Sequence, residues 1–282
     1  DGDRIAIALG NRPEWPTVFF ALLYSGAIPV PLNQHGSLSD IKNILADAEC
    51  KIAFTESPCP SLDIRSVPVE SDEFKRALSA RPTEACHSGA QRNDTACIMY
   101  TAGTTSHPKG VMLSHGNLLH NIESCRIVLQ TVSADRFAVL LPLFHTYMLT
   151  CGLLLPLLIG GSMVLVKSLH PVRNVLQEII LRQATVLPAI PQVFRGMVNA
   201  PIPVPLPLRI CVSGSAPLPG QILTEFEARF HIPLIEGYGL SEASPVVAKN
   251  PLDRTRKAGS IGLPIPNVEM SIQDDTGREL PM

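Results

Sequence analysis

The sequence predicts an α/β fold with two packed, mostly parallel sheets that are flanked by helices. Three observations support this prediction. Short apolar runs of strand length alternate with amphipathic runs of helix length in residues 5–55. The same alternation returns in residues 138–236, and between the two stretches Ala96–Tyr100 has the length of a buried strand. Such alternation is typical of parallel sheets with right-handed crossovers.

Before residue 56 the pattern predicts three strands and two helices. The strands are Ile5–Leu9, Ile28–Pro31 and Lys51–Thr55. The helices are Pro13–Ser25 and a segment that starts at Ser39 or Asp40 and continues to Ala48. Residues 56–94 are expected to be polar and irregular, apart from a weak helix near Asp72–Ala80. After the strand at Ala96–Tyr100, a helix is expected over Gly116–Thr131.

The second stretch predicts a further series of strands and helices. Its strands are Ala138–Leu141, Ser162–Val166, Thr185–Leu187, Leu208–Val212 and Leu234–Glu236. Its helices are Leu149–Leu158, Val172–Gln183, Pro191–Val198 and Leu218–Phe230. The uncharged run 137–166 is long enough to span a bilayer, but its prolines and glycines favour strand, helix and strand. Beyond Lys257 the pattern indicates a strand at Glu269–Gln273 and a hairpin turn at Asp274–Gly277.

The composition indicates a globular protein and excludes several classes of function. The 282 residues are 45% hydrophobic and 17% charged, which is enough material for two packed subdomains. A formal net charge of −2 gives no electrostatic footprint for nucleic acid. The seven cysteines include no CxxC pair, so we expect reduced thiols of a cytoplasmic protein rather than a zinc site or disulfides. No signal peptide is visible and no Met begins the chain, so we expect a piece of a longer protein.

Thr101–Gly110 forms a hydroxyl-rich loop directly after the predicted buried strand. Small residues let backbone N–H groups approach an anion, hydroxyls add donors, and Lys109 adds a positive charge. The loop therefore suits a phosphate. A solvated, hydroxyl-rich turn explains the same composition equally well. The spacing from Gly103 to Lys109 does not fit a Walker P-loop.

A resemblance decides between these two interpretations. Tyr100–Val111 reads Tyr-Thr-Ala-Gly-Thr-Thr-Ser-His-Pro-Lys-Gly-Val and resembles the phosphate-loop signature of the adenylate-forming (AMP-binding) superfamily. Ala102 and Ser106 depart from that pattern, which has Ser and Gly there. Four more segments resemble the superfamily, and the last two are most similar to long-chain fatty acyl-CoA synthetases: Asn11–Trp15, Ser25–Asn33, Pro191–Arg195 and Ser213–Pro219.

Two further loops follow predicted strands and complete a composite site. Ser213–Pro217 follows the strand that ends at Val212, and Gly237–Glu242 follows the strand that ends at Glu236. Open α/β sheets bind ligands at the carboxyl ends of their strands. Taken alone, each loop is better explained as a tight turn or a solvated surface. Taken together with the phosphate loop, and with Gly237–Glu242 resembling the superfamily's Tyr-Gly-x-Thr-Glu motif, they indicate one nucleotide site.

The resemblance implies a role for each residue that matches a motif. Adenine would lie between Tyr238 and the segment Ser215, Ala216 and Pro217. Ser241 would donate to the α-phosphate, and Glu242 and Thr104 would hold Mg²⁺. The β- and γ-phosphates would be held by Thr101, Thr104, Thr105 and Lys109. The other implied nucleotide-binding residues are Gly103, Ser106, Gly110, Gly214, Glu236, Gly237 and Gly239. Leu141–His145 resembles a Pro-Leu-Phe-His segment, which would place His145 where the acyl carboxylate meets the α-phosphate; without the resemblance it reads as a core histidine.

The implied activity is ATP-dependent activation of a carboxylic acid through an acyl-adenylate, followed by thioester formation with CoA. The resemblance favours a medium-to-long fatty acid, whose amphiphilic product would be compatible with peripheral membrane contact. Lys109, His145, Ser241 and Glu242 would carry the catalysis. An acyl carrier protein is the alternative acceptor, and a non-catalytic nucleotide- or acyl-binding module is the alternative class. Apolar residues that could line the acyl pocket are Met148, Leu149, Leu153, Val193, Phe194 and Met197.

The predicted chain divides into three parts. Residues 1–134 form a first α/β subdomain that ends with the phosphate loop and its helix. Residues 135–256 form a second α/β subdomain with the adenine and acyl pockets. By resemblance, residues 257–282 begin a small β-barrel. The resemblance also places a mobile C-terminal domain beyond Met282, so we expect this chain alone to adenylate poorly.

Overall fold

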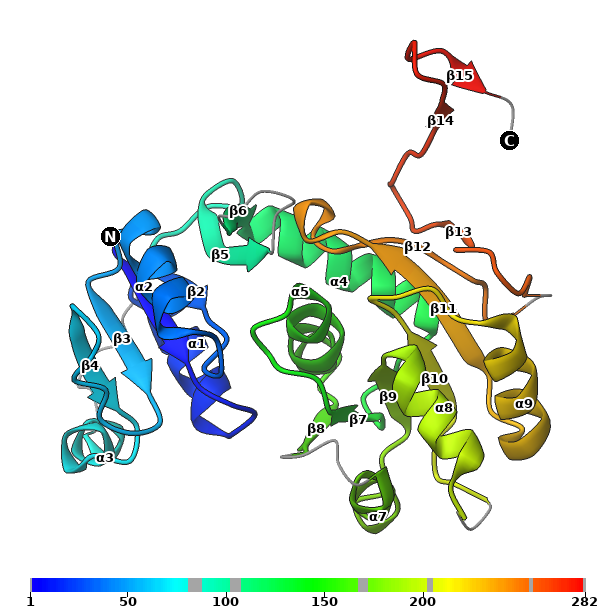
Figure 1. Cartoon of the computed structure of the whole chain (residues 1–282), viewed down its shortest axis with the longest axis horizontal. Helices are drawn as coiled ribbons and strands as arrows, with labels where there is room; N and C mark the ends of the chain where they lie inside the picture. Colours follow the sequence, from blue (N-terminus) through cyan, green and yellow to red (C-terminus); the bar gives the residue numbers. More distant parts are fainter. Residues whose placement is uncertain are drawn as a thin grey trace.

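The computed structural model describes residues 2–80, 88–101, 108–166, 172–201, 205–253 and 256–280. Residues 102–107, most of the predicted phosphate loop, lie outside this part of the chain. The described chain forms two parallel sheets flanked by helices, a separate hairpin and a C-terminal extension (Figure 1). The predicted α/β fold class is confirmed.

The first sheet consists of four parallel strands in the order β2-β1-β3-β4. Its strands are β1 (Arg4–Ala8), β2 (Ile28–Pro31), β3 (Ile52–Thr55) and β4 (Arg65–Pro68), and its helices are α1 (Glu14–Tyr24), α2 (Leu38–Asp47) and α3 (Asp72–Ser79). Ser37 caps α2 by accepting from the N–H of Asp40, so the predicted start at Ser39 or Asp40 is wrong. β4 was not predicted, because Val67 is its one buried residue and this edge strand has no apolar alternation.

The second sheet has seven strands in the order β13-β12-β11-β10-β9-β7-β8. Five of them are parallel: β7 (Arg136–Val139), β8 (Ser162–Leu165), β9 (Val186–Ala189), β10 (Ile210–Ser213) and β11 (Leu234–Gly239). β12 (Val246–Lys249) and β13 (Leu263–Pro264) continue the sheet in antiparallel register. One face packs against α7 (Val172–Leu181), α8 (Pro191–Asn199) and α9 (Gly220–Phe230). The other face packs against α4 (His115–Leu129) and the helical segment 146–158.

The strand before the phosphate loop belongs to neither parallel sheet. β5 (Thr95–Thr101) pairs antiparallel with β6 (Lys109–Ser114) as a hairpin, so the expectation that all three ligand loops end parallel strands is wrong for the first loop. The sequence did not predict β6, because Lys109 and Gly110 are exposed and polar or small, and the strand has one buried residue. Ser114 then starts α4 through a reciprocal capping box with Asn117.

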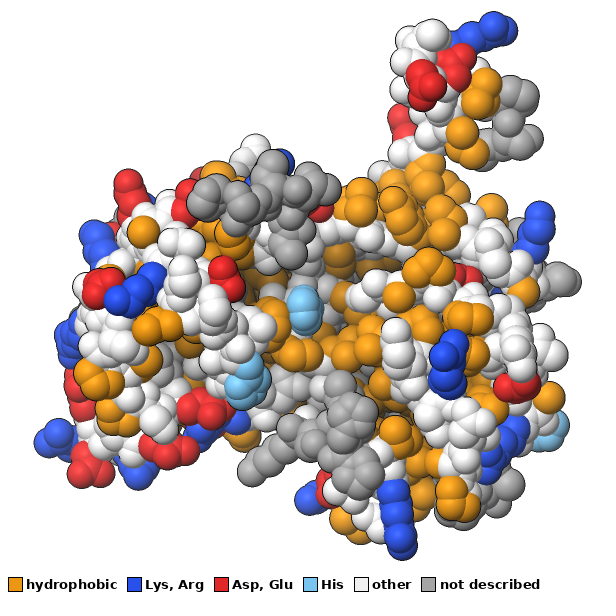
Figure 2. Space-filling model, viewed as in Figure 1, with side chains coloured by type: hydrophobic (Ala, Val, Ile, Leu, Met, Phe, Trp, Pro, Cys, Tyr) orange, Lys and Arg blue, Asp and Glu red, His pale blue; other side chains and the backbone are white. Residues whose placement is uncertain are grey.

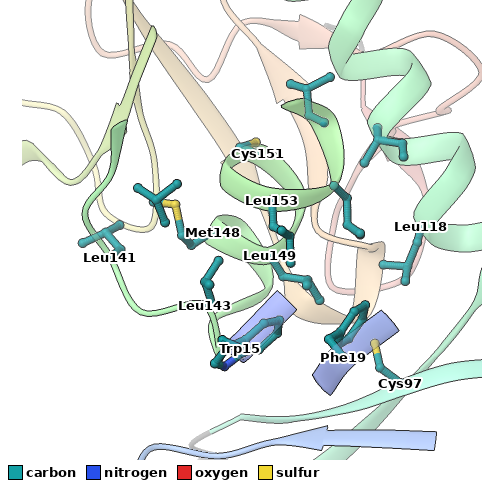
Figure 3. Packing of buried hydrophobic residues seen from close by; sticks show 14 of the residues in the cluster. Trp15, Phe19, Cys97, Leu118, Leu141, Leu143, Met148, Leu149, Cys151 and Leu153 are labelled. Carbon is teal, nitrogen blue, oxygen red and sulfur yellow. The ribbon is translucent and has the colours of Figure 1, made fainter. Parts of the chain in front are cut away.

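The segment predicted as one helix, Leu149–Leu158, is divided between two helical geometries. It comprises a π-helical turn η1 (Leu149–Leu154) and α6 (Leu155–Leu158), and the short α5 (Thr146–Met148) directly precedes it. A Cβ at Gly152 would lie 2.1 Å from the sulfur of Met148, so a larger residue in this wider turn would require the Met148 side chain to move. The turn packs on Trp15 and Phe19 of α1 and thereby joins the two sheets through one apolar core (Figure 3).

The C-terminal residues leave the body of the protein. β14 (Ile272–Gln273) and β15 (Glu279–Leu280) form the predicted hairpin around Asp274–Gly277, and Figure 1 shows it projecting from the large sheet. A β-barrel over residues 257–282 and the three-part division of the chain remain predictions. Among the described helices, none combines the length and the apolar character that a bilayer crossing requires.

Candidate active site

A cavity of about 130 Å³ lies at the carboxyl ends of β10 and β11. The two strands run side by side, with Ser213 opposite Glu236, so the loops that follow them leave the same edge of the sheet. Figure 2 shows this face of the molecule hollowed, with hydrophobic side chains and a histidine in the hollow. The cavity is lined by His145, Thr146, Tyr147, Val212, Ser213, Gly214, Ser215, Gly237, Tyr238, Gly239, Leu240, Ser241, Pro245, Val246 and Lys249.

The loop after β10 is held against Tyr147. The Tyr147 hydroxyl donates to the carbonyl of Val212 at 2.9 Å, and a Cβ at Gly214 would lie 3.1 Å from the Tyr147 ring. Glu236 is buried, and its carboxylate accepts the N–H of Leu218 at 2.9 Å. Glu236 therefore anchors the far end of this loop and does not line the cavity. Ala216 and Pro217 lie outside the cavity wall as well.

The predicted loop Gly237–Glu242 begins later than expected. Gly237, Tyr238 and Gly239 still belong to β11, which leaves its parallel partner β10 and pairs antiparallel with β12. A Cβ at Gly239 would lie 2.1 Å from the carbonyl oxygen of Pro245, so this pairing requires glycine. The sequence missed the extension because β12 was not predicted. Tyr238 is 39% exposed at the cavity, where its ring is free to stack on a planar ligand.

Ser241 is oriented by a residue that the motifs did not reveal. The hydroxyl of Ser241, in the short helix η2 (Ser241–Ala243), lies 2.6 Å from the hydroxyl of buried Thr146. Thr146 directly follows His145 in the sequence, which is the one signal that could have pointed to it. Glu242 is exposed, and no hydrogen bond or ion pair engages it among the described residues. Its carboxylate is therefore available to a cation.

His145 stands at the mouth of the cavity. Its ring is exposed and lies 4.3 Å, centroid to centroid, from the ring of Phe144. Desolvation by the surrounding protein lowers the pKa of His145 below its ordinary value of 6.5. At neutral pH the imidazole is therefore uncharged, and it can donate one hydrogen bond to an oxygen of a substrate.

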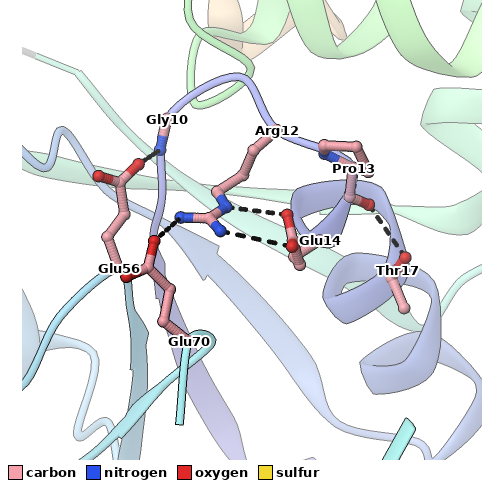
Figure 4. Close-up of polar contacts among 7 residues, drawn as sticks. All are labelled: Gly10, Arg12, Pro13, Glu14, Thr17, Glu56 and Glu70. Atoms are coloured by element: carbon pink, nitrogen blue, oxygen red, sulfur yellow. Dashed lines mark hydrogen bonds and ion pairs between the residues drawn. The ribbon is translucent and has the colours of Figure 1, made fainter. Parts of the chain in front are cut away.

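The loop that carries His145 is anchored by Asn11 from the first sheet. The Asn11 amide donates to the carbonyl of Leu141 at 2.9 Å and accepts the N–H of Leu143 at 3.1 Å. Its own loop is fixed by ion pairs of Arg12 with Glu14 and Glu70 (Figure 4). The sequence placed Asn11 in a motif but did not reveal this positioning role.

The hairpin brings the described ends of the phosphate loop together. Thr101 and Lys109 lie opposite one another in β5 and β6, and β6 lies against η2. Gly110 leaves room for the ring of Tyr100, since a Cβ there would lie 3.1 Å from it. The remaining predicted loop residues, Gly103, Thr104, Thr105 and Ser106, lie outside the described residues.

Two expectations about ligands can be compared with this geometry. The six residues predicted to line an acyl pocket, Met148, Leu149, Leu153, Val193, Phe194 and Met197, are buried in the core, and none lines the cavity. They occupy helix faces that pack on the sheet, as apolar residues at helical spacing usually do.

In the described part of the chain no three His, Cys, Asp or Glu residues gather as a metal site. A lone carboxylate such as Glu242 fits Mg²⁺, which keeps several waters and is completed by substrate phosphates.

The sequence of the chain matches that of a known protein family. The sequence profile described as AMP-binding enzyme matches residues 1–282. The chain belongs to the AMP-binding enzyme family. The predicted resemblance is confirmed.

The relatives of this AMP-binding chain are longer than the chain itself. It is 32% identical to a long-chain-fatty-acid–CoA ligase of Yersinia pestis, and the match covers 99% of this chain and 58% of that relative. It is 31% identical to a 2-succinylbenzoate–CoA ligase of Bacillus velezensis, over 97% of this chain and 56% of the relative. The crystal structure of ATP-bound MatB from Rhodopseudomonas palustris matches with a TM-score of 0.89 and 27% identity, over 99% of this chain and 58% of that chain. The chain thus spans a little over half the length of these relatives.

Proposed function

We propose that the protein activates a carboxylic acid with ATP and transfers the acyl group to CoA. The observation that carries this proposal is the meeting of Ser241, Thr146 and His145 at one cavity, beside the base of the phosphate hairpin. Hydroxyl donors and a neutral imidazole there suit the first step of this reaction, which transfers no proton and builds negative charge on phosphate oxygens. Membership of the AMP-binding family and resemblance to named CoA ligases support it.

In the first step a carboxylate oxygen attacks the α-phosphorus of ATP, and pyrophosphate leaves. Ser241 would donate to an oxygen of the α-phosphate while Thr146 holds its hydroxyl in place. His145 would donate to the acid, and Lys109 and Thr101 would bind the leaving pyrophosphate. Tyr238 would stack on adenine opposite the Gly214–Pro217 loop. Mg²⁺ held by Glu242 would neutralise the phosphate oxygens. In the second step a CoA thiol would attack the acyl carbon and release AMP.

The names of the relatives and the volume of the cavity bear on which acid is activated. A fatty acid is supported by the Yersinia relative, whereas the Bacillus relative is named for an aromatic acid. The cavity, which also carries the proposed adenine and α-phosphate contacts, has a volume of about 130 Å³. A cavity of that size favours a short acid over a long alkyl chain.

Pyrophosphate exchange with a panel of acids tests the proposal. Exchange should require both ATP and an acid, and it should fall about 100-fold in Glu242→Gln. Glu225→Gln is the matched control, because Glu225 lies on the exposed side of helix α9 and accepts a hydrogen bond from the neighbouring Gln221. Because this chain alone is expected to adenylate slowly, the decisive quantity is exchange above the rate measured without acid. If ATP and acids bind by calorimetry but no acid raises exchange above that rate, the protein is a binding module and the enzyme proposal fails.

A further inference from the structure

The cavity wall contains a charged side chain without a partner. Lys249 ends β12, lines the cavity and is 2% exposed. Its Nζ is buried and has no hydrogen-bond partner among the residues that the structure describes. Burying a lone ammonium is strongly unfavourable unless an anion or another acceptor accompanies it. The described chain supplies neither to Lys249.

The sheet register keeps the neighbouring carboxylate away from Lys249. Lys249 pairs with Gly237 across β11 and β12, and Glu236 directly precedes Gly237. Because successive side chains of a strand point to opposite faces, Glu236 and Lys249 lie on opposite faces of the sheet. The Glu236 carboxylate already accepts the N–H of Leu218. It therefore forms no ion pair with Lys249.

Two glycines pack against Lys249, one on its side chain and one on its backbone. A Cβ at Gly237 would lie 3.2 Å from Cγ and 3.5 Å from Cε of Lys249, so the aliphatic stem runs across Gly237 at the cavity wall. A Cβ at Gly262, where φ is +89°, would lie 2.1 Å from the carbonyl carbon of Lys249. The second glycine packs directly on the backbone of Lys249 and holds the end of β12 in place.

The charge of Lys249 also acts on two buried thiols. Cys125 of α4 and Cys151 of η1 are buried and hydrogen-bond to one another. This hydrogen bond and, against the effect of burial, the charge of Lys249 lower the pKa of the Cys151 thiol to about 7. Neither sulfur lies within hydrogen-bonding distance of the Lys249 Nζ, so these cysteines do not replace a carboxylate as its partner.

We propose that Lys249 binds a second carboxylate of the substrate, and that the acid is a short dicarboxylic acid. This inference rests on the proposed function, in which the reacting carboxylate lies beside Ser241 and exposed His145. The second carboxylate then extends toward buried Lys249 at the inner wall of the same cavity. A cavity of about 130 Å³ accommodates a spacer of a few carbons between the two groups. An ammonium removed from water discriminates strongly between a carboxylate and a methyl group at that end.

Matched acids of equal length test the assignment in the pyrophosphate exchange reaction. Wild-type protein should use succinate and glutarate with at least tenfold higher kcat/KM than butyrate and pentanoate. In Lys249→Met this ratio should fall at least 100-fold, and the monocarboxylates should become the better substrates. Lys257→Met removes an exposed lysine outside the cavity wall and should leave the ratio unchanged. Equal use of both acids by the wild type, or an equal loss for both in Lys249→Met, overturns the proposal.

Thermal unfolding and calorimetry test the role of Lys249 independently of exchange activity. The Tm of Lys249→Met should rise, because the variant no longer buries an unpaired charge; if the variant fails to fold, Lys249→Gln takes its place in every comparison. If no acid supports exchange in the wild type, the proposed function fails, and calorimetry of glutarate and pentanoate still tests Lys249. Binding of glutarate that is at least tenfold tighter and is lost in Lys249→Met supports the assignment, whereas equal binding of the two acids overturns it.

Discussion

The hydroxyl oxygens of Thr146 and Ser241 lie 2.6 Å apart and join α5 to η2 across 95 positions of the chain. Thr146 is buried, whereas Ser241 is half-buried at the cavity. The hydrogen bond therefore holds the exposed end of the pair in one orientation. Ser241 is the hydroxyl proposed to donate to the α-phosphate, and Thr146 is its positioning residue.

If this pair acts as a unit, its two variants should not be additive. Ser241→Ala is expected to lower kcat of pyrophosphate exchange about 100-fold, the usual effect of removing one donor to developing charge. Thr146→Val should lower it about tenfold, and the double variant should resemble Ser241→Ala alone. Thr224→Val is the control, because it removes an exposed hydroxyl that donates a hydrogen bond to the carbonyl of Gly220 in α9. Fully additive losses would show that the two hydroxyls act separately.

Asn11 is expected to support the site from the first sheet. Asn11→Ala removes a donor to Leu141 and an acceptor for Leu143, which should cost about 2 kcal/mol in the free energy of unfolding. The loop before His145 then loses its anchor, so kcat/KM for the acid should fall about tenfold while the Kd of ATP changes less than twofold. Urea unfolding, exchange kinetics and calorimetry measure the three quantities. Asn199→Ala removes an exposed hydrogen bond in α8 and should change none of them. Equal weakening of acid use and ATP binding would argue against a local role.

Elements with regular apolar patterns could be predicted from the sequence, and elements defined by their partners could not. Helix α8 was predicted within one residue, because its buried residues Val193, Phe194 and Met197 recur at helical spacing. Strands β4 and β12 were missed because pairing, and not composition, makes them strands. The extension of β11 through Tyr238 depends on β12 and was missed with it.

The residues of the candidate site also fall into those that a local motif predicts and those that only long-range contacts reveal. Short motifs revealed His145, Tyr238 and Ser241, since each lies in a local run of distinctive residues. Asn11 and Thr146 act through contacts with residues 130 and 95 positions away, which no local pattern encodes. Lys249 was missed because β12, which carries it, was not predicted, and a lysine is ordinarily exposed to solvent.

The lowered pKa of His145 predicts a loss of stability in mild acid. Desolvation by the surrounding protein favours the neutral ring of His145, so the unfolded chain binds a proton at higher pH than the folded chain does. The free energy of unfolding is therefore unaffected by His145 above the unfolded pKa of about 6.5. It decreases as the pH falls below that value, because protonation of His145 then favours the unfolded chain. Urea unfolding at pH 7.5 and pH 5.5 should therefore show a larger decrease in the wild type than in His145→Gln. His35→Gln alters an exposed histidine outside the cavity and should behave like the wild type. Identical pH profiles for wild type and His145→Gln would contradict the prediction.

Asp135 should stabilise the second sheet at a position remote from the cavity. It is 2% exposed and accepts hydrogen bonds from Arg209 at 2.7 Å, from the N–H of Val132 at 2.8 Å and from Thr185 at 2.8 Å. Burial opposes its ionisation, but these donors, Arg209 first, outweigh burial and hold the pKa of Asp135 below its usual value of 3.8. Its contribution is therefore present above pH 3.8 and is lost as the pH falls through the folded value.

Asp135→Asn is expected to lower the free energy of unfolding by about 3 kcal/mol at pH 7, because it leaves Arg209 without its counterion and the donors with one weaker acceptor. Glu123→Gln breaks an exposed ion pair on α4 and should cost less than about 0.5 kcal/mol, since solvent screens such pairs. Urea unfolding at pH 7 compares the two, and repetition at pH 3 should narrow the difference between Asp135→Asn and the wild type. A difference that stays constant between pH 7 and pH 3 would mean that the charge of Asp135 is not what stabilises the fold, and that its shape and hydrogen bonds suffice.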